Sequence, residues 1–152
     1  LRDYREKYKN VLEISNLLSA KQFEVSAAVV RLNEQLSAEK AKTAALKKRL
    51  IAEKAAGFEP DTDKTAVFEN GLDIKELQLL ADALCKKAGG IRGAFSGADG
   101  AFSFAICGEE TALGDFFAEF KAAFNTRGGG RNGIRQGTVC ADRAEIERLF
   151  TE

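Results

Sequence analysis

Histidine, methionine and tryptophan are absent from this chain of 152 residues, and only one proline is present. The lack of histidine removes the commonest general base and the commonest zinc ligand. The composition therefore excludes a Ser-His-Asp triad, a Cys-His pair or a histidine-rich metal site within this chain. Its three cysteines are odd in number and show no Cys-x-x-Cys spacing, so we expect reduced thiols in a cytoplasmic protein.

Long apolar runs are also missing. No segment approaches the roughly 20 apolar residues that a membrane span needs, so we expect no membrane partner. The first residues, Leu1–Arg5, are too charged for a signal peptide, and the absence of methionine leads us to expect a fragment of a longer protein. Apolar residues (45%) and charged residues (30%) nevertheless occur in the proportions of a folded globular chain.

Charge is distributed unevenly, although the net charge is zero. Residues 1–57 carry 12 Lys and Arg against 7 Asp and Glu, whereas residues 58–152 carry 11 against 16. Such an asymmetry indicates two modules with different surfaces. We therefore predict two domains with these boundaries.

Residues 1–57 have the pattern of a long, coiled-coil-like helical hairpin. Apolar residues recur at spacings of three, four and seven over residues 1–18, which predicts an amphipathic helix. The sequence from Ser19 to Gln22 matches a capping box, so a second helix is expected to begin near Ala20. It should end at Gly57 in the left-handed conformation of a helix cap.

The second helix carries an apolar seam with 4-3-4 spacing from Val25 to Leu50. Such a seam fits either an antiparallel hairpin that packs on itself or a dimer contact. A secondary basic patch lies near the end of this helix, at Lys47, Lys48 and Arg49. These cations can meet phosphates, or they can form a solvated helix face.

Residues 58–152 have the pattern of a small α/β domain with a mixed sheet. Alternating apolar residues predict half-buried strands, and amphipathic segments opened by capping boxes at Asp73-x-x-Glu76 and Asp142-x-x-Glu145 predict helices. The element order is β-α-β-β-α-loop-β-α, so the whole chain is predicted to have an α+β fold. Most of the eleven phenylalanines are expected in its core.

A loop rich in glycine and arginine, residues 125–137, is the best candidate for a binding site. No acidic residue occurs between Lys121 and Gly137. Three consecutive glycines allow close backbone approach and an anion-binding nest of N–H groups, while arginines can bind phosphate oxygens in a bidentate manner. A flexible hinge is the alternative explanation. The candidate nucleic-acid-binding residues are Lys121, Arg127, Gly128, Gly129, Gly130, Arg131, Arg135 and Gln136.

The second module resembles the DHH-associated domain found at the C-terminus of alanyl-tRNA synthetases, of freestanding alanyl-tRNA editing proteins and of DHH phosphoesterases. The family pattern is Gly-Gly-Gly-Arg, a short spacer, then Gln-Gly and a strand. Here these are Gly128–Arg131 and Gln136–Val139. The segment Leu1–Arg5 also resembles the exit of the editing domain. One departure is Asn132, where members of the family often have proline.

The resemblance implies a non-catalytic, tRNA-binding C-terminal module that grips tRNA(Ala) through the Gly-Gly-Gly-Arg loop. The parent protein would then be an aminoacyl-tRNA deacylase, with a possible homodimer through the helical arm. No cofactor is expected in this fragment, since the His and Cys ligands for zinc would lie in the parent's editing domain. The alternative is an assembly module that makes no contact with nucleic acid.

Overall fold

The structure is a computed structural model that describes residues 2–60 and 62–151. The chain divides into two units, residues 1–46 and residues 47–152. The two compact units divide within the long helix α2 (Val25–Ala56), and the domain boundary after residue 57 stays a prediction. The physical reason for the division within α2 is Ile51, which is buried together with Leu72 and Leu77 and so ties the end of α2 to the second unit.

The first unit contains helix α1 (Arg2–Leu17), a short 3-10 turn (Gln22–Glu24) and the first part of α2. Two successive helices joined by a tight connection agree with the prediction. Their apolar side chains, however, remain exposed to solvent, including Tyr4, Tyr8, Val11, Leu12, Val29, Leu32 and Leu36. None of the helices in the described part of the chain is long and apolar enough to span a bilayer.

The predicted capping box at Ser19 is wrong. Ser19 has a φ of 49° and follows the end of α1, with a hydrogen bond from the N–H of Ala20 to the carbonyl of Ser15 (3.0 Å). A second bond joins the N–H of Ser19 to the carbonyl of Asn16 (3.2 Å). These bonds form a Schellman motif, so Ser19 terminates the first helix and does not cap the second. Helix α2 accordingly starts at Val25, five positions later than expected.

The second unit is built on a five-stranded mixed sheet with the order β1-β2-β3-β5-β4. The strands are β1 (Lys64–Phe68), β2 (Ile91–Ala98), β3 (Ala101–Cys107), β4 (Asn125–Gly129) and β5 (Ile134–Cys140). Strand β1 pairs with β2 in parallel, and all other neighbours are antiparallel. The α+β class and the mixed sheet are therefore confirmed.

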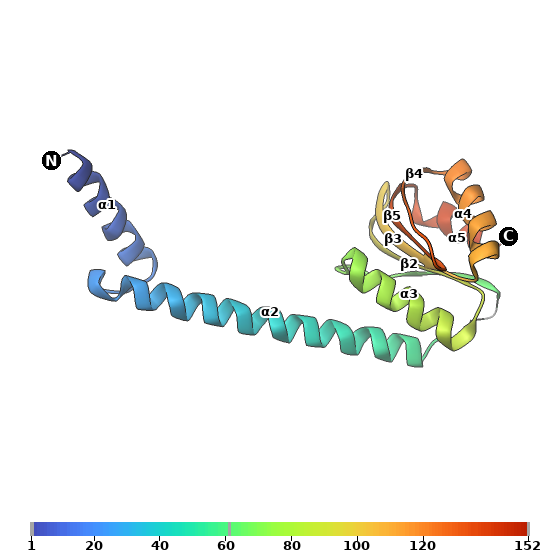
Figure 1. The fold of residues 1–152 in the computed structure, drawn as a ribbon, viewed down its shortest axis with the longest axis horizontal. Coiled ribbons are helices and arrows are strands. Elements are labelled where there is room, and N and C mark those ends of the chain that lie inside the picture. Colours follow the sequence, from blue (N-terminus) through green and yellow to red (C-terminus); the bar gives the residue numbers. More distant parts are fainter. Residues whose placement is uncertain (1, 61, 152) are drawn as a thin grey trace. The chain divides into compact units, whose positions relative to one another are not determined.

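Helices cover both faces of this sheet (Figure 1). One face packs against α3 (Ile74–Ala88) through a core of leucines and small residues. The other packs against α4 (Glu110–Ala123) and α5 (Arg143–Thr151) through a core rich in phenylalanine. Alternation along β3 explains this division, because Phe102, Phe104 and Ile106 face one side and Ala105 and Cys107 face the other.

The helix caps follow the sequence in one case and depart from it in another. The capping box of α3 is confirmed: Asp73 accepts from the N–H of Glu76 (2.9 Å), and Glu76 accepts from the N–H of Asp73 (2.8 Å). Gly57 follows the last residue of α2 as predicted, but its φ lies outside the left-handed region. Its N–H bonds to the carbonyl of Glu53 (3.0 Å), so no left-handed cap forms there.

The predicted loop over residues 125–137 is largely a strand pair. Residues Asn125–Gly129 form β4, which pairs antiparallel with β5, so only a short turn remains between them. The composition concealed this strand because it is rich in glycine and polar residues, which are depleted in strands. All of the binding-site candidates except Lys121 therefore lie on a β-hairpin.

Candidate nucleic-acid interface

The glycines of the β4–β5 hairpin have two different roles. Gly128 and Gly137 face each other across the two strands. A Cβ atom on Gly128 would lie 2.1 Å from the carbonyl oxygen of Gln136, and one on Gly137 would lie 2.0 Å from that of Arg127. These two glycines are therefore required for strand pairing. A Cβ on Gly129 would have no atom within 4 Å, so this position is open.

A tight turn connects the two strands. Asn132 and Gly133 have φ values of 57° and 75°, and the carbonyl of Arg131 accepts from the N–H of Ile134 (3.4 Å). Two successive positive φ values define a type I′ turn, for which Asn-Gly is the preferred sequence. The Asn132-Gly133 pair is a hairpin signal that our sequence analysis missed. The positive φ of residue 132 is compatible with asparagine and excludes proline, whose ring fixes φ at a negative value.

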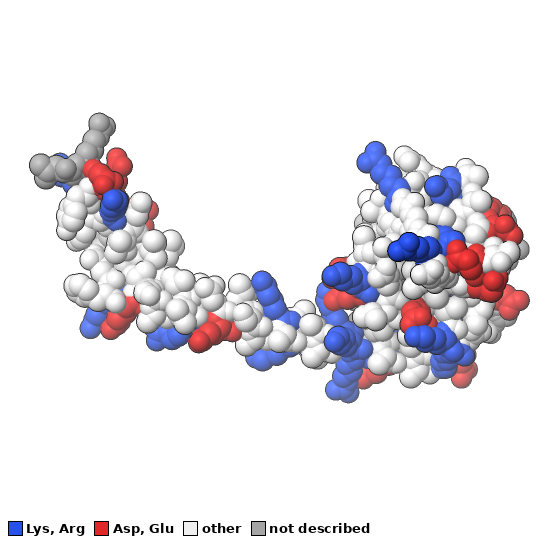
Figure 2. Space-filling view, viewed as in Figure 1, with Lys and Arg blue, Asp and Glu red and all other residues white. Residues whose placement is uncertain are grey.

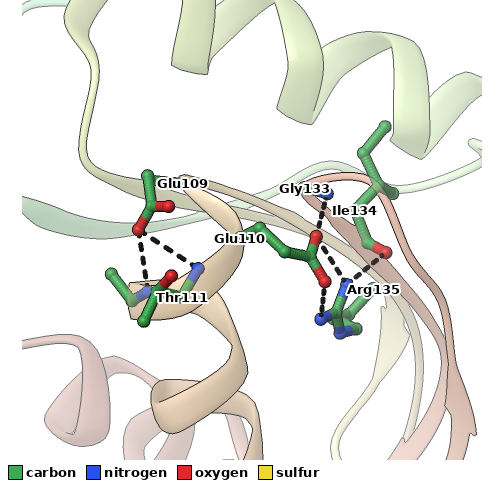
Figure 3. A network of polar contacts seen from close by, with 7 residues as sticks. Glu109, Glu110, Thr111, Gly133, Ile134 and Arg135 are labelled. Atoms are coloured by element: carbon green, nitrogen blue, oxygen red, sulfur yellow. Dashed lines mark hydrogen bonds and ion pairs between the residues drawn. The ribbon is translucent and has the colours of Figure 1, made fainter.

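The turn is fastened to the start of α4 by Glu110 (Figure 3). The Glu110 carboxylate accepts from Nη2 of Arg135 (2.6 Å) and from its Nη1 (3.4 Å), and also from the N–H of Gly133. The carbonyl of Gly133 in turn accepts from the N–H of Gly108 (3.0 Å), which precedes α4. Both the N–H and the carbonyl group of Gly133 are therefore bonded to residues at or just before the start of α4.

Hydrogen bonds lower the pKa of two neighbouring carboxyl groups at this helix start. The hydrogen bond from Arg135 is the main cause of the lowered pKa of Glu110, and the N–H of Gly133 adds to it. The N–H groups of Ala112 and Thr111 lower the pKa of Glu109. Both carboxylates are therefore ionised at neutral pH. The Arg135 guanidinium, whose side chain is only 11% exposed, is consequently neutralised by an internal anion.

A groove of about 420 Å³ lies between the turn and α3. Gln78 reaches into it from α3, and Gln136 reaches into it from β5, where the Gln78 Nε2 donates to the Gln136 Oε1. Each amide keeps further hydrogen-bonding capacity that can serve a ligand. Gln78 was not among the predicted residues. The groove is lined by Gln78, Gly130, Arg131, Asn132, Ile134 and Gln136.

The predicted arginines have three different environments. Arg131 lines the groove and is exposed. Arg127 is exposed on β4, in register with Thr138, and therefore lies on the same sheet face as Gln136. Neither Arg127 nor Arg131 forms an ion pair with a residue in the ranges 2–60 and 62–151. Arg135, by contrast, lies on the opposite sheet face and binds Glu110.

Lys121 is not brought to the groove. It lies on α4, which covers the other face of the sheet, and its Nζ is 5.7 Å from the centre of the Phe117 ring. The hairpin therefore presents fewer free cations on the groove side than the sequence alone indicated, namely Arg127 and Arg131.

The secondary basic patch is also partly neutralised. Lys47 pairs with Glu76 (2.9 Å) and Arg49 pairs with Glu53 (2.8 Å). Lys48 is exposed. Figure 2 shows Lys and Arg interspersed with Asp and Glu over the visible face of the molecule. The charges thus form no large field of one sign on this face, and attraction for an anion must be local.

The described residues contain no cluster of three or more His, Cys, Asp and Glu side chains that can hold a metal ion. Burial raises the pKa of the Cys107 thiol to about 12, which makes it unreactive at neutral pH. Cys140 is exposed on β5, outside the residues that line the groove.

Several solved structures are similar to this chain, and they include the following two. The C-Ala domain of alanyl-tRNA synthetase from Aquifex aeolicus is 18% identical over 58% of this chain and 90% of that chain, with a TM-score of 0.44. RecJ from Thermus thermophilus, solved in complex with Mg²⁺, is 14% identical over 86% of this chain, with a TM-score of 0.48. The match spans only 20% of the RecJ chain.

Both structures are less than 20% identical to this chain, so the resemblance to the DHH-associated domain stays a prediction from the sequence. With TM-scores below 0.5 the two similarities carry no argument about function. No protein-family model matches the chain, and no curated protein matches it.

Proposed function

We propose that residues 47–152 form a tRNA-binding module that contacts the RNA backbone at the groove beside the β4–β5 turn. The observation that carries the proposal is the groove itself, where an exposed arginine, a glycine-rich backbone and two glutamine amides meet in about 420 Å³. Arginine provides charge-assisted hydrogen bonds to phosphate. The glutamines can donate to and accept from a ribose or a base edge.

Arg131 and Arg127 are the groups assigned to phosphate. Both are exposed and lie on the groove side of the sheet. The resemblance to the Gly-Gly-Gly-Arg and Gln-Gly motif supports the same assignment for Gly128–Arg131 and Gln136. Arg135 is reassigned from phosphate binding to fixing the turn, because its guanidinium is bound to Glu110.

The test is the affinity for a tRNA(Ala) transcript as a function of salt concentration, measured for the wild type, Arg131→Ala and Arg148→Ala. Arg148 is exposed on α5, away from the groove, and is a matched loss of one positive charge. We expect Arg131→Ala to weaken binding about tenfold and to reduce the log–log salt slope by roughly 0.7–0.9, the value for one phosphate contact. Arg148→Ala should change little. Equal affinities and equal salt slopes for Arg131→Ala and Arg148→Ala would overturn the assignment of Arg131 to phosphate.

The wider role proposed for the chain is the C-terminal part of an alanyl-tRNA editing or synthetase-related protein of the cytoplasm. This module would hold tRNA(Ala), while a separate domain of the parent, with zinc held by His and Cys, would hydrolyse mischarged tRNA. The module itself would have no catalytic activity and no cofactor. The parent gene provides the test: a His and Cys zinc-site pattern upstream is expected, and its absence would contradict the editing role.

A second candidate role is assembly of a homodimer through the first unit. Its apolar side chains are exposed, and those on α1 line a hollow of about 380 Å³ formed by Tyr4, Arg5, Tyr8, Lys9 and Leu12. The 4-3-4 spacing on α2 favours a second copy of this chain as the partner, through coiled-coil pairing. Sedimentation equilibrium should show a dimer for the wild type and a monomer for Leu32→Glu/Leu36→Glu. A monomer for both the wild type and the double variant would exclude this role.

A further inference from the structure

Two adjacent glutamates at the start of α4 have different tasks. Glu109 is the N-cap residue, and its carboxylate accepts from the N–H groups of Thr111 (3.1 Å) and Ala112 (3.0 Å). The next carboxylate, Glu110, points away from the helix backbone and toward the hairpin turn (Figure 3). Because the cap is already satisfied by Glu109, the contacts of Glu110 are not needed to start the helix.

The contacts of Glu110 fix the turn next to the groove. It binds Gly133, the third residue of the type I′ turn, and Arg135, at the start of β5. The side chain of Arg135 is 11% exposed, so its guanidinium has little access to an external partner. Arg131 begins the same turn and lines the groove. The Glu110 carboxylate therefore fixes the backbone segment that carries the groove-lining Arg131.

We propose that Glu110 is a positioning residue for RNA binding, which holds the Arg131–Ile134 turn so that Arg131 faces the groove before RNA arrives. This inference rests on the proposed function of the groove. A turn that is already ordered does not lose conformational freedom on binding, and this raises affinity without adding a contact. Glu110 itself touches no RNA in this scheme.

Electrostatic repulsion alone predicts the opposite effect of the Glu110 carboxylate on RNA affinity. A carboxylate close to a phosphate site repels the ligand, so removing its charge should tighten binding. Glu109 offers the matched control, because it carries the same charge one residue away and, among the described residues, accepts no hydrogen bond from the turn. In Glu109→Gln the side-chain carbonyl can still accept the two helix N–H groups. The comparison of Glu110→Gln with Glu109→Gln therefore separates positioning from charge.

The experiment measures binding of a tRNA(Ala) transcript against salt for the wild type, Glu109→Gln, Glu110→Gln, Glu110→Asp and Arg131→Ala. Glu109→Gln should bind as well as the wild type or slightly better. Glu110→Gln should bind about fivefold more weakly than Glu109→Gln, with an unchanged salt slope, because no phosphate contact is removed. Glu110→Asp keeps the charge but shortens the side chain, and it should also bind more weakly than the wild type.

A second readout needs no RNA. Hydrogen exchange at the Gly133 N–H should be faster in Glu110→Gln than in Glu109→Gln, since the amide has a single acceptor oxygen where the Glu110 carboxylate uses two for Gly133 and Arg135. If Glu110→Gln does not fold, as thermal unfolding would show, Glu110→Asp carries the test. Binding of Glu110→Gln equal to or tighter than that of Glu109→Gln would overturn the inference alone. Failure of the wild type to bind RNA, or no effect of Arg131→Ala, would overturn the proposed function and the inference with it.

Discussion

Apolar side chains are abundant in both units of the chain, but the large ones form buried cores in only one of them. In residues 47–152 they form two cores, one on each face of the sheet. Among the residues of the first unit whose burial the structure describes, the buried positions are Ser15 and Ala28, while most large apolar side chains of α1 and of the first part of α2 are exposed. The same helical periodicity thus occurs in both units. An amphipathic pattern predicts that a helix has an apolar face, but it does not reveal which partner covers that face.

The largest expected effect compares the same substitution in the two units. Leu80 on α3 is fully buried, whereas Leu36 on α2 is 50% exposed. Leu80→Ala should lower the free energy of unfolding by about 2–5 kcal/mol through lost burial and a cavity. Leu36→Ala should change it by less than about 0.5 kcal/mol in a monomer. Chemical denaturation followed by circular dichroism measures both. An equally large loss for Leu36→Ala would show that its face is buried in an assembly.

A loss of stability of intermediate size is expected for a glycine substitution within the β4–β5 hairpin of the second unit. Gly137→Ala would place a Cβ 2.0 Å from the Arg127 carbonyl oxygen, whereas Gly129→Ala has open space. Because the obstacle is backbone, the strands must move apart, and we expect a loss of about 1–3 kcal/mol for Gly137→Ala. Gly129→Ala should stay within about 0.5 kcal/mol of the wild type in the same denaturation experiment. Similar losses for both would contradict the structural role of the facing glycines.

The smallest effect concerns acid stability at the start of α4. The pKa values of Glu109 and Glu110 are lowered in the folded state. Their contribution to stability is therefore fully present above the unfolded glutamate pKa of about 4.3 and is lost as the pH falls through the folded values. The melting temperature of Glu109→Gln/Glu110→Gln should decline less steeply than that of the wild type below about pH 5. If the melting temperatures of the wild type and the double variant changed equally between about pH 3 and pH 7, the two carboxylates would not have this role in acid stability.

Much of the second unit could be predicted because its local signals agree with its tertiary packing. Alternation identified β3, and the Asp73-x-x-Glu76 box identified the start of α3. Arg92 shows the limit of this reasoning. It lies between apolar positions of β2, and a charged residue there is expected to face solvent. The structure instead buries it, where it donates to the carbonyl of Thr62 (2.8 Å) and to Thr65 (2.9 Å).

The candidate site was predicted less completely, for reasons of distance along the chain. The glycine-rich segment and the exposed arginines could be recognised locally. The partner of Arg135 could not, because Glu110 is 25 residues away and is brought close only by the packing of α4. Gln78 was missed for the same reason, since 58 residues separate it from Gln136. Ser19 was misassigned because serine favours both helix starts and turns, and the φ it adopts is decided by the preceding helix.

Strand β4 has a consequence for the solubility of the protein. It has a single neighbour in the sheet, β5, so one side of its backbone is an open edge. Open edges can recruit strands from other molecules, and proteins suppress this with short strands and charged residues. Asn125–Gly129 is five residues long and combines two glycines of low strand propensity with the charge of Arg127. The residues proposed to attract RNA thus also discourage the growth of the sheet into aggregates.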